Sequence, residues 1–442
     1  MIVSKEKIAA IPILLTLWLS GFIFPTVIPL VMLAMTLISI RLIFLYKNVQ
    51  PVFIYYIFHL SYVVMLIPYF LFDIPITPHS EFQIAKYMDS TLLVHGAFVF
   101  TLYFFSDLNA PKQLVVIAEH LPSRKDTAVF LFLAGAMLAI IVSMQIGSVN
   151  IYSIDAAQAW DAYNDNISAS SGAPEYFLVF FVTAFIFAKS YRLKLILTII
   201  FCIFIYSGFT RGMRVSLLMP ILLYFALFLD GKFRTRYIFI MAIVGMVLVQ
   251  AAGFLRDGKR AAMELFSLFS GTALLTNQGE VFYTTNIIVS ALIDGVCGMK
   301  ERMFSLFAAL LQTILPPRIG LGSIGKPALY VWDLTGREAG GGGLISGFFY
   351  FWLDYFGVVL IAFFIAILTN KVINKPTSLL SLYIICLYSF YPRWLAYDPV
   401  NFMFRMPLYA ICLYLLLKQF QMTMKLVKDS KKDMTLPSGV TP

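Results

Sequence analysis

Long apolar runs separated by short polar segments make up most of the chain. Most of these runs approach the ~20 residues that an α-helix needs to cross the hydrocarbon core of a bilayer. Because backbone N–H and C=O groups cannot stay unpaired in hydrocarbon, each run is predicted to be a helix. The predicted spans are residues 8–24, 26–46, 52–72, 89–106, 127–147, 175–189, 194–209, 214–230, 237–255, 347–369, 377–392 and 402–419.

Composition supports a membrane protein. Of the 442 residues, 60% are hydrophobic and 13% are charged, whereas soluble proteins average about 45–50% apolar and about 25% charged residues. A soluble enzyme, a disordered chain and a disulfide scaffold are therefore excluded. The predicted fold class is an all-α polytopic integral membrane protein with about 12 transmembrane helices. The four Cys and four His lack metal-site spacing, so no metal and no cofactor are expected.

The distribution of charge predicts an orientation. If the N-terminus is cytoplasmic, the inner segments hold 20 Lys/Arg and 7 Asp/Glu, and the rest of the chain holds 13 and 16. Basic residues accumulate in cytoplasmic loops, so both termini are predicted to be cytoplasmic. The same rule accounts for the net charge of +10 without nucleic acid. The segment 148–174 contains three Asp and no Lys or Arg, which indicates an outer loop.

Four regions follow from this layout. Residues 1–255 form an N-terminal membrane region with nine spans, 256–346 a large outer loop, 347–419 a membrane region with three spans, and 420–442 a basic cytoplasmic tail. The large loop contains short apolar runs at 263–269, 286–293 and 303–311. These are predicted to be amphipathic helices at the outer leaflet. Two further spans, fourteen in total, are the alternative.

Arginines recur on the outer side, where the insertion bias disfavours them. The guanidinium group presents a planar fork of donors that matches phosphate oxygens. Several converging on a bilayer surface predict a site for an anionic lipid headgroup or a diphosphate. Alternatively, each one extends to water or pairs with a neighbouring carboxylate. The candidates are Arg211, Arg214, Arg256, Arg260, Arg337, Arg393 and Arg405.

Three outer carboxylates are candidates for a general base. Glu280 lies between two apolar runs whose side chains would partly desolvate it and raise its basicity. Glu338 and Asp398 rank lower because neighbouring arginines would lower their basicity. A solvated loop carboxylate is the alternative for Glu280. Asp294 and Asp354 are weaker candidates.

Two further features have alternative interpretations. The glycine run 340–343 is either a hinge before the next span or a nest of backbone N–H groups beside Arg337. His59 and His95 fall inside predicted spans and are either packed, hydrogen-bonded side chains or members of a proton relay.

The layout of spans, inner termini and a late outer loop is similar to that of the Wzy-type O-antigen polymerases, the oligosaccharide repeat unit polymerases of bacterial envelopes. Local similarity lies in residues 207–216, in residues 335–350 running into 354–357, and in the spacing of Arg260 and Gly271. The resemblance implies a glycosyltransferase in the bacterial inner membrane. It would transfer a growing glycan from undecaprenyl diphosphate to a new lipid-linked repeat unit, without a cofactor. A separate regulator protein would set chain length.

Three other functions compete with polymerisation. A lipid-linked oligosaccharide flippase would have short loops and internal repeats, and no repeat is evident. An O-antigen ligase would have a His in the large loop, and residues 256–346 contain none. An ion-coupled transporter would carry carboxylates in mid-span, whereas nearly all Asp and Glu lie at predicted span ends or in loops.

Overall fold

The fold is known from a computed structural model, which describes residues 5–72, 87–107, 113–154, 172–213, 215–257, 277–315, 323–336 and 342–434, with the single positions 111, 158, 162, 165 and 166. Within these ranges every regular element is a helix, and β pairing is limited to one isolated bridge between Lys125 and Ala188. The chain is therefore a helical membrane protein, as its composition predicts.

The first half of the chain forms helices that mostly alternate with short loops. They are α1 (Lys5–Ile23), η1 (Pro25–Val27), α2 (Ile28–Leu45), α3 (Gln50–Val64), α4 (Ile67–Phe72), α5 (Met88–Phe105), η3 (Ile117–His120), α6 (Thr127–Gln145), η4 (Ile151–Ser153), α8 (Ala173–Phe187), α9 (Tyr191–Thr210), α10 (Val215–Tyr224), η5 (Phe225–Leu229) and α11 (Thr235–Asp257).

The second half contains α13 (Asn277–Ile293), α14 (Met299–Gln312), α15 (Pro327–Thr335), α16 (Ile345–Asn374), α17 (Ser378–Ser389), α18 (Tyr391–Trp394), η6 (Val400–Arg405) and α19 (Met406–Met434). Among the described residues, eight helical segments are long and apolar enough to cross a membrane. Four shorter apolar helices, Ala173–Phe187, Ser216–Leu229, Thr235–Gly245 and Ser378–Ser389, overlap the remaining predicted spans.

The helix starts follow local sequence rules. The Asp126 side chain accepts hydrogen bonds from the N–H groups of Ala128 and Val129, both at 3.1 Å, and so caps α6. Ser190 caps α9 in the same way through the N–H of Leu193. Proline occupies the first turn of α3, α8 and α15, where its missing N–H needs no intrahelical partner.

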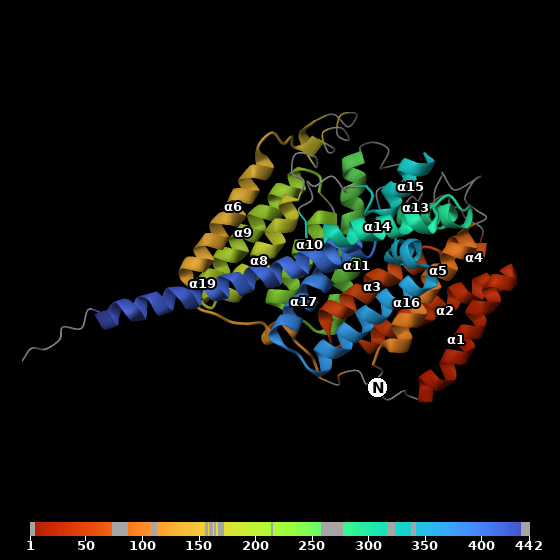
Figure 1. The fold of residues 1–442 in the computed structure, drawn as a ribbon, viewed down its shortest axis with the longest axis horizontal. Coiled ribbons are helices and arrows are strands. Elements are labelled where there is room, and N and C mark those ends of the chain that lie inside the picture. The colour runs from red at the N-terminus through yellow and green to blue at the C-terminus, as the bar shows by residue number, and fades with distance from the viewer. Residues whose placement is uncertain are drawn as a thin grey trace, which may run out of the picture.

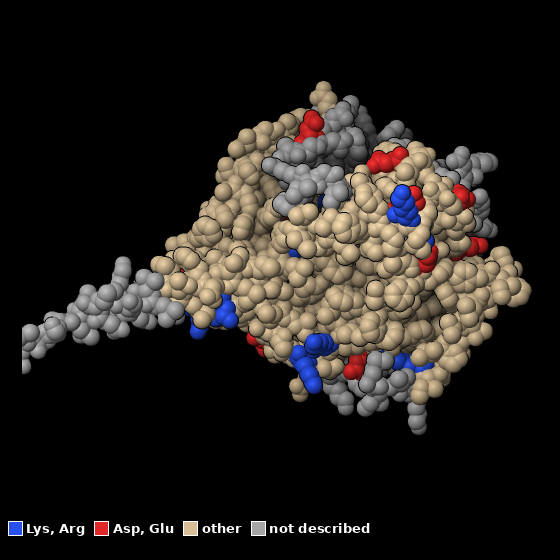
Figure 2. All heavy atoms as spheres, viewed as in Figure 1, with Lys and Arg blue, Asp and Glu red and all other residues tan. Residues whose placement is uncertain are grey.

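The helices pack into one bundle (Figure 1). Helices α6, α8 and α9 pack together on one flank, α1 and α2 form the other, and α5 packs against α16 between them. On the side shown in Figure 2, Lys, Arg, Asp and Glu lie near two opposite edges, with a broad band of other residues between them. Such a band matches a bilayer's hydrocarbon core.

Hydrogen bonds tie the basic loops into one end of the bundle, here named the basic face and comprising 41–50, 107, 113–126, 186–194, 230–236 and 370–375. Val115 N–H donates to the Asn48 carbonyl at 2.9 Å, and Gln50 Nε2 to the Phe233 carbonyl at 2.8 Å. The backbone N–H of Asp107 donates to Asn370 Oδ1 at 3.0 Å. Segments predicted to share the inner side therefore do lie together.

The other end is named the Arg393 face and comprises 208–213, 215–216, 294–299, 323–327 and 391–398. Two helices near this face, α14 and α13, differ from each other in which side chains they bury. In α14 the large side chains Phe304, Phe307 and Leu310 are exposed, whereas Arg302 and Ser305 face the bundle. An apolar face turned outward fits a helix lying at the membrane surface.

Helix α13 differs from the prediction for residues 286–293. Its side chains from Val281 to Ala291 are largely buried among α3, α5, α15 and α16, so it is part of the bundle. Polar side chains of this helix point inward. Thr285 Oγ1 accepts a hydrogen bond from the N–H of Leu344 at 2.8 Å, and Asn286 Oδ1 accepts one from the Thr91 hydroxyl at 2.7 Å.

Helix α16 is kinked at Leu353 and Asp354. Asp354 has φ 53° and ψ −151°, a conformation that residues other than glycine rarely adopt. Its carboxylate pairs with Arg302 Nη2 of α14 at 2.8 Å, and Arg302 Nε also donates to the Phe351 carbonyl at 2.5 Å. The kink is therefore joined to the surface helix α14.

Candidate functional site

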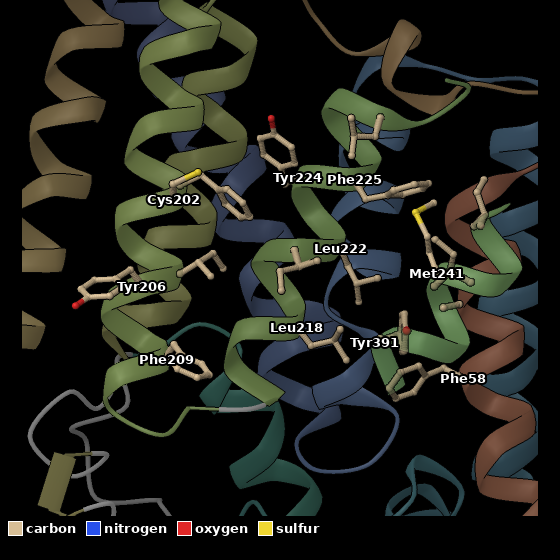
Figure 3. A pocket seen from close by; sticks show the side chains of 18 residues that line it. Phe58, Cys202, Tyr206, Phe209, Leu218, Leu222, Tyr224, Phe225, Met241 and Tyr391 are labelled. Carbon is tan, nitrogen blue, oxygen red and sulfur yellow. The ribbon is translucent and has the colours of Figure 1, made fainter. Parts of the chain in front are cut away.

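A groove of about 630 Å³ lies between α9, α10 and α11 and is lined almost entirely by apolar side chains (Figure 3). Tyr224 and Leu229 line the part nearer the basic face, and Phe209, Leu218 and Tyr391 line the part nearer the Arg393 face. Ile221 lines the groove and is also exposed, so the groove is open to the lateral surface of the bundle. A groove of this kind suits a hydrocarbon chain better than a polar ligand.

Arg393 lies close in sequence to residues that line this groove. It stands two residues after Tyr391 in α18, and its Nη2 donates to Ser216 Oγ at 2.8 Å, two residues before Leu218 in α10. Its guanidinium carbon lies 5.3 Å from the centre of the Tyr397 ring. Its Nε is buried and has no hydrogen-bond partner among the described residues. One donor is thus free for a ligand beside the groove.

Charged groups from three other elements surround Arg393. Lys326 Nζ lies 3.1 Å from Asp398 Oδ2, and Asp398 Oδ1 accepts the N–H of Asn401 at 3.0 Å. Glu175, in the first turn of α8, interacts electrostatically with Arg393, Asp398 and Lys326. Its Oε2 is buried without a described hydrogen-bond partner. With all four groups ionised, this cluster is neutral.

Arg211 adds positive charge on the same face. It follows α9 directly, is 1% exposed, and donates through Nη2 to the Asn166 carbonyl. Its Nε and Nη1 have no partner within the described ranges. A buried guanidinium with unused donors is costly, so the arrangement favours an anion.

Arg405, in η6, is 4% exposed and is held by its own helix. Its Nε lies 3.3 Å from the Tyr409 hydroxyl, and its Nη1 lies 3.5 Å from Asn401 Oδ1. Its Nη2 is unpaired in the described part of the chain. Arg211, Arg393 and Arg405 therefore each retain at least one buried donor without a partner in the described part of the chain.

The remaining predicted site residues are less informative. Arg214, Arg260, Arg337 and Glu338 lie outside the described residues, as does the side chain of Arg256. Glu280 lies in the first turn of α13 and is exposed, although the next two residues, Val281 and Phe282, are buried. The desolvation expected of Glu280 is thus not seen. Asp294 accepts a hydrogen bond from the Tyr87 hydroxyl.

Part of the glycine run is required by close packing. A Cβ atom at Gly342 would lie 2.3 Å from Tyr397 Cδ1 and 2.7 Å from the Ala396 carbonyl oxygen. Nearby, the N–H of Ile345 donates to the Leu395 carbonyl at 2.8 Å. Gly342 therefore lets the start of α16 approach the segment that carries Arg393, while the predicted nest beside Arg337 lies outside the described residues.

Glu175, Lys326 and Ser216 belong to the site although sequence reasoning did not select them. Glu175 could have been selected from the sequence, because it is a carboxylate at the first residue of a predicted span. Lys326 and Ser216 had none, because only tertiary packing brings them to Asp398 and Arg393.

The described side chains form no group of three or more His, Cys, Asp or Glu that could hold a metal ion. The site can bind an anion through arginine donors and position a hydrocarbon chain in the adjoining groove. No protein-family model, curated protein or solved structure matches this chain.

Proposed function

We propose that this protein polymerises oligosaccharide repeat units linked to undecaprenyl diphosphate, at the outer face of a bacterial inner membrane. The carrying observation is that Arg211 and Arg393, each with a buried donor unpaired among the described residues, lie two residues from Phe209 and Tyr391, which line an apolar groove. A polyprenyl diphosphate has the matching form, with a long hydrocarbon chain and an anionic head. The resemblance in layout to the O-antigen polymerases supports the same substrate class.

The arginines have a defined role in this reaction. Transfer of the glycan breaks its bond to the diphosphate, and negative charge grows on the leaving oxygen. Fixed donors aimed at that charge stabilise the transition state more than the ground state. Arg393 is the best placed, because it has a free Nε and adjoins both Ser216 and the groove residue Tyr391.

The acceptor sugar hydroxyl must lose a proton during transfer, and a carboxylate is the expected base. Glu280 remains the proposed base. It lies five residues before Thr285, and the Thr285 hydroxyl accepts a hydrogen bond from the N–H of Leu344. The next residue, Ile345, donates its N–H to the carbonyl of Leu395, two residues after Arg393. Asp398 is paired with Lys326 at 3.1 Å and is therefore less available to a substrate hydroxyl.

Deletion of the gene, followed by electrophoresis of lipopolysaccharide, tests the function. A polymerase mutant keeps lipid A core and core carrying one repeat unit, and loses the long-chain ladder. Complementation with the intact gene should restore the ladder. Loss of even the single repeat unit would instead indicate a flippase or a ligase, and an unchanged ladder would contradict all three.

Arg393→Ala tests the site within the same assay. Loss of one preorganised donor should lower the rate about 100- to 1000-fold, or ~3–4 kcal/mol. Arg393→Lys keeps the charge and loses the fork, so it should restore little activity. Arg236→Ala is the matched control, because Arg236 is an exposed residue of the basic face whose guanidinium lies over Tyr237. Normal polymer from Arg393→Ala at normal protein level would remove Arg393 from the site.

A further inference from the structure

A line of polar side chains crosses the interior of the bundle and meets the groove of the arginine site only at Tyr391. It begins at the Arg393 face on α5, where Tyr87, Thr91 and His95 follow one another at intervals of four residues and so share one side of the helix. Each has a polar partner on another element. The partners are Asp294 for Tyr87, Asn286 for Thr91 at 2.7 Å, and Ser346 for His95 Nδ1 at 3.1 Å.

Two histidines meet in the middle of this line. His59 of α3 lies with its ring centre 5.4 Å from that of His95, and both residues are 0% exposed. One turn earlier on α3, the Tyr55 ring lies 6.1 Å from His59 and 5.5 Å from Tyr391. The polar line thus passes from α5 to α3 near the centre of the bundle.

The line continues to the basic face. The Tyr55 ring contacts that of Tyr56 at 4.8 Å, and Tyr56 stacks on Tyr46 at 5.3 Å. The Tyr46 hydroxyl donates to Asn370 Oδ1 at 3.3 Å, and the same oxygen accepts the N–H of Asp107 at 3.0 Å. The line therefore ends at the Asp294 carboxylate on one face and beside Asp107 on the other, where Asp107 joins Asn370 through its backbone N–H and its carboxylate accepts from Asn374 Nδ2 at 3.3 Å.

The centre of the line is rich in buried polar atoms without partners. Within the described residues, these are the hydroxyl oxygens of Tyr55, Tyr56 and Tyr391, both ring nitrogens of His59, and Nε2 of His95. Buried polar groups are nearly always hydrogen-bonded, because an unmade bond leaves their desolvation uncompensated. Phenylalanine in these positions would avoid that penalty.

Water satisfies such groups most simply. A buried water makes about 3 hydrogen bonds and needs polar partners on several sides, which this cluster supplies. One water also joins two groups that lie too far apart for a direct bond, as the two imidazoles do here. A chain of waters, imidazoles and hydroxyls would then be continuous through the bundle.

We propose that this line is a hydrated pathway that conducts protons between the two faces. A proton enters from water beside one terminal carboxylate. Each imidazole accepts a proton on one nitrogen and releases one from the other, and each hydroxyl accepts and donates in the same way. One proton leaves at the far face for each that enters, no covalent bond to carbon changes, and the membrane potential supplies the driving force.

Purified protein in proteoliposomes tests the proposal. With a pH dye inside and a potassium diffusion potential imposed by valinomycin, wild-type vesicles should acidify faster than protein-free vesicles. His59→Phe should reduce the rate to that of protein-free vesicles, and Tyr55→Phe should lower it. Wild-type flux equal to that of protein-free vesicles would overturn the proposal, and so would unchanged flux in His59→Phe.

Tyr383→Phe provides the matched control. Tyr383 is a partly buried tyrosine of α17 that lies off the line, and its hydroxyl donates to the Met403 carbonyl at 2.8 Å. Removal of this hydroxyl should leave the proton flux unchanged, although the hydrogen bond to the Met403 carbonyl is lost. If Tyr383→Phe and Tyr55→Phe lower the flux equally, the loss is a general packing effect and the pathway is refuted. Arg393 is not part of the line, so proton flux and polymerisation can fail independently.

Discussion

Two carboxylates near the Arg393 face have opposite surroundings. Glu280 is exposed, whereas Glu175 has a buried oxygen and interacts with Arg393. A general base must reach the acceptor hydroxyl, and its removal typically costs 10²–10⁴-fold in rate, roughly. Glu280→Gln, which cannot accept the proton, should therefore abolish long-chain polymer.

Glu175→Gln is the companion change. It removes a negative charge beside Arg393, which strengthens anion binding there, so the variant should retain polymerisation. Both proteins should accumulate normally in membranes, as checked by immunoblot. Retained polymer in Glu280→Gln combined with loss in Glu175→Gln would transfer the base to Glu175.

Asp230, in the loop after η5, is 7% exposed. Burial raises its pKa from 3.8 to about 7, and Glu119 adds to the rise, while the backbone N–H groups of Ile117 and Gly231 oppose it. The folded state thus holds the proton more tightly than the unfolded state. The free energy of unfolding should fall as pH rises from about 4 to about 7, then level off.

Asp230→Asn should remove this pH dependence, because the amide cannot ionise. Above pH 7 the variant should be more stable than wild type by up to roughly 4 kcal/mol, the limit that linkage sets. Apparent melting temperatures in detergent between pH 5 and pH 8 measure the effect. An equal slope in the two proteins would show that Asp230 is not responsible.

Residue identity alone predicts some site members and not others. Arg393 and Arg405 could be selected because arginine on the outer side opposes the insertion bias, and Asp398 because it lies between them. The exposure of Glu280 could not be predicted from its apolar neighbours. In a helix, adjacent residues point in different directions, so Val281 and Phe282 are buried while Glu280 is not.

At the level of elements, the kink of α16 requires glycine at position 357. A Cβ atom at Gly357 would lie 2.3 Å from the Phe349 carbonyl oxygen, closer than any real contact. Gly357→Ala must therefore shift the backbone at the kink, and overpacking of this kind costs about 1–3 kcal/mol. The variant should melt at a lower temperature in detergent.

Gly135→Ala is the matched control, because nothing lies within 4 Å of a Cβ atom at Gly135 in α6. There alanine should be neutral or should stabilise the helix by up to roughly 1 kcal/mol. Equal melting temperatures for Gly357→Ala and wild type would mean that the kink relaxes without strain.

Helices are the part of this fold that sequence predicts best, and short ones are predicted least well. A run of ~20 apolar residues has one stable backbone solution in a bilayer, so long helices follow from hydropathy. The segment 286–293 is too short for that rule, and its polar residues fit either water or partners within the bundle. The hydrogen bonds that Thr285 and Asn286 make to residues outside α13 place this segment within the bundle.

Over the whole molecule, hydropathy and charge predict which segments share an end, but they do not predict lateral order. The basic loops do meet at one face, as the hydrogen bonds of Asn48, Gln50 and Asn370 show. The neighbours of each helix depend on side-chain packing, which leaves no periodic trace in uniformly apolar spans. For that reason neither the apolar groove nor the contact of Arg393 with Ser216 beside it could be predicted from the sequence.

The orientation of the whole bundle can be tested with two lysines on opposite faces. Lys232 lies exposed in a basic loop and Lys300 lies exposed on α14, beside the Arg393 face. The charge bias places basic loops in the cytoplasm. In a variant without native cysteines, Lys300→Cys should react with a membrane-impermeant thiol reagent in cells whose inner membrane is intact. Lys232→Cys should react only after that membrane is permeabilised, and the reverse pattern would invert the bundle and place the arginine cluster on the cytoplasmic side, against the proposed polymerase.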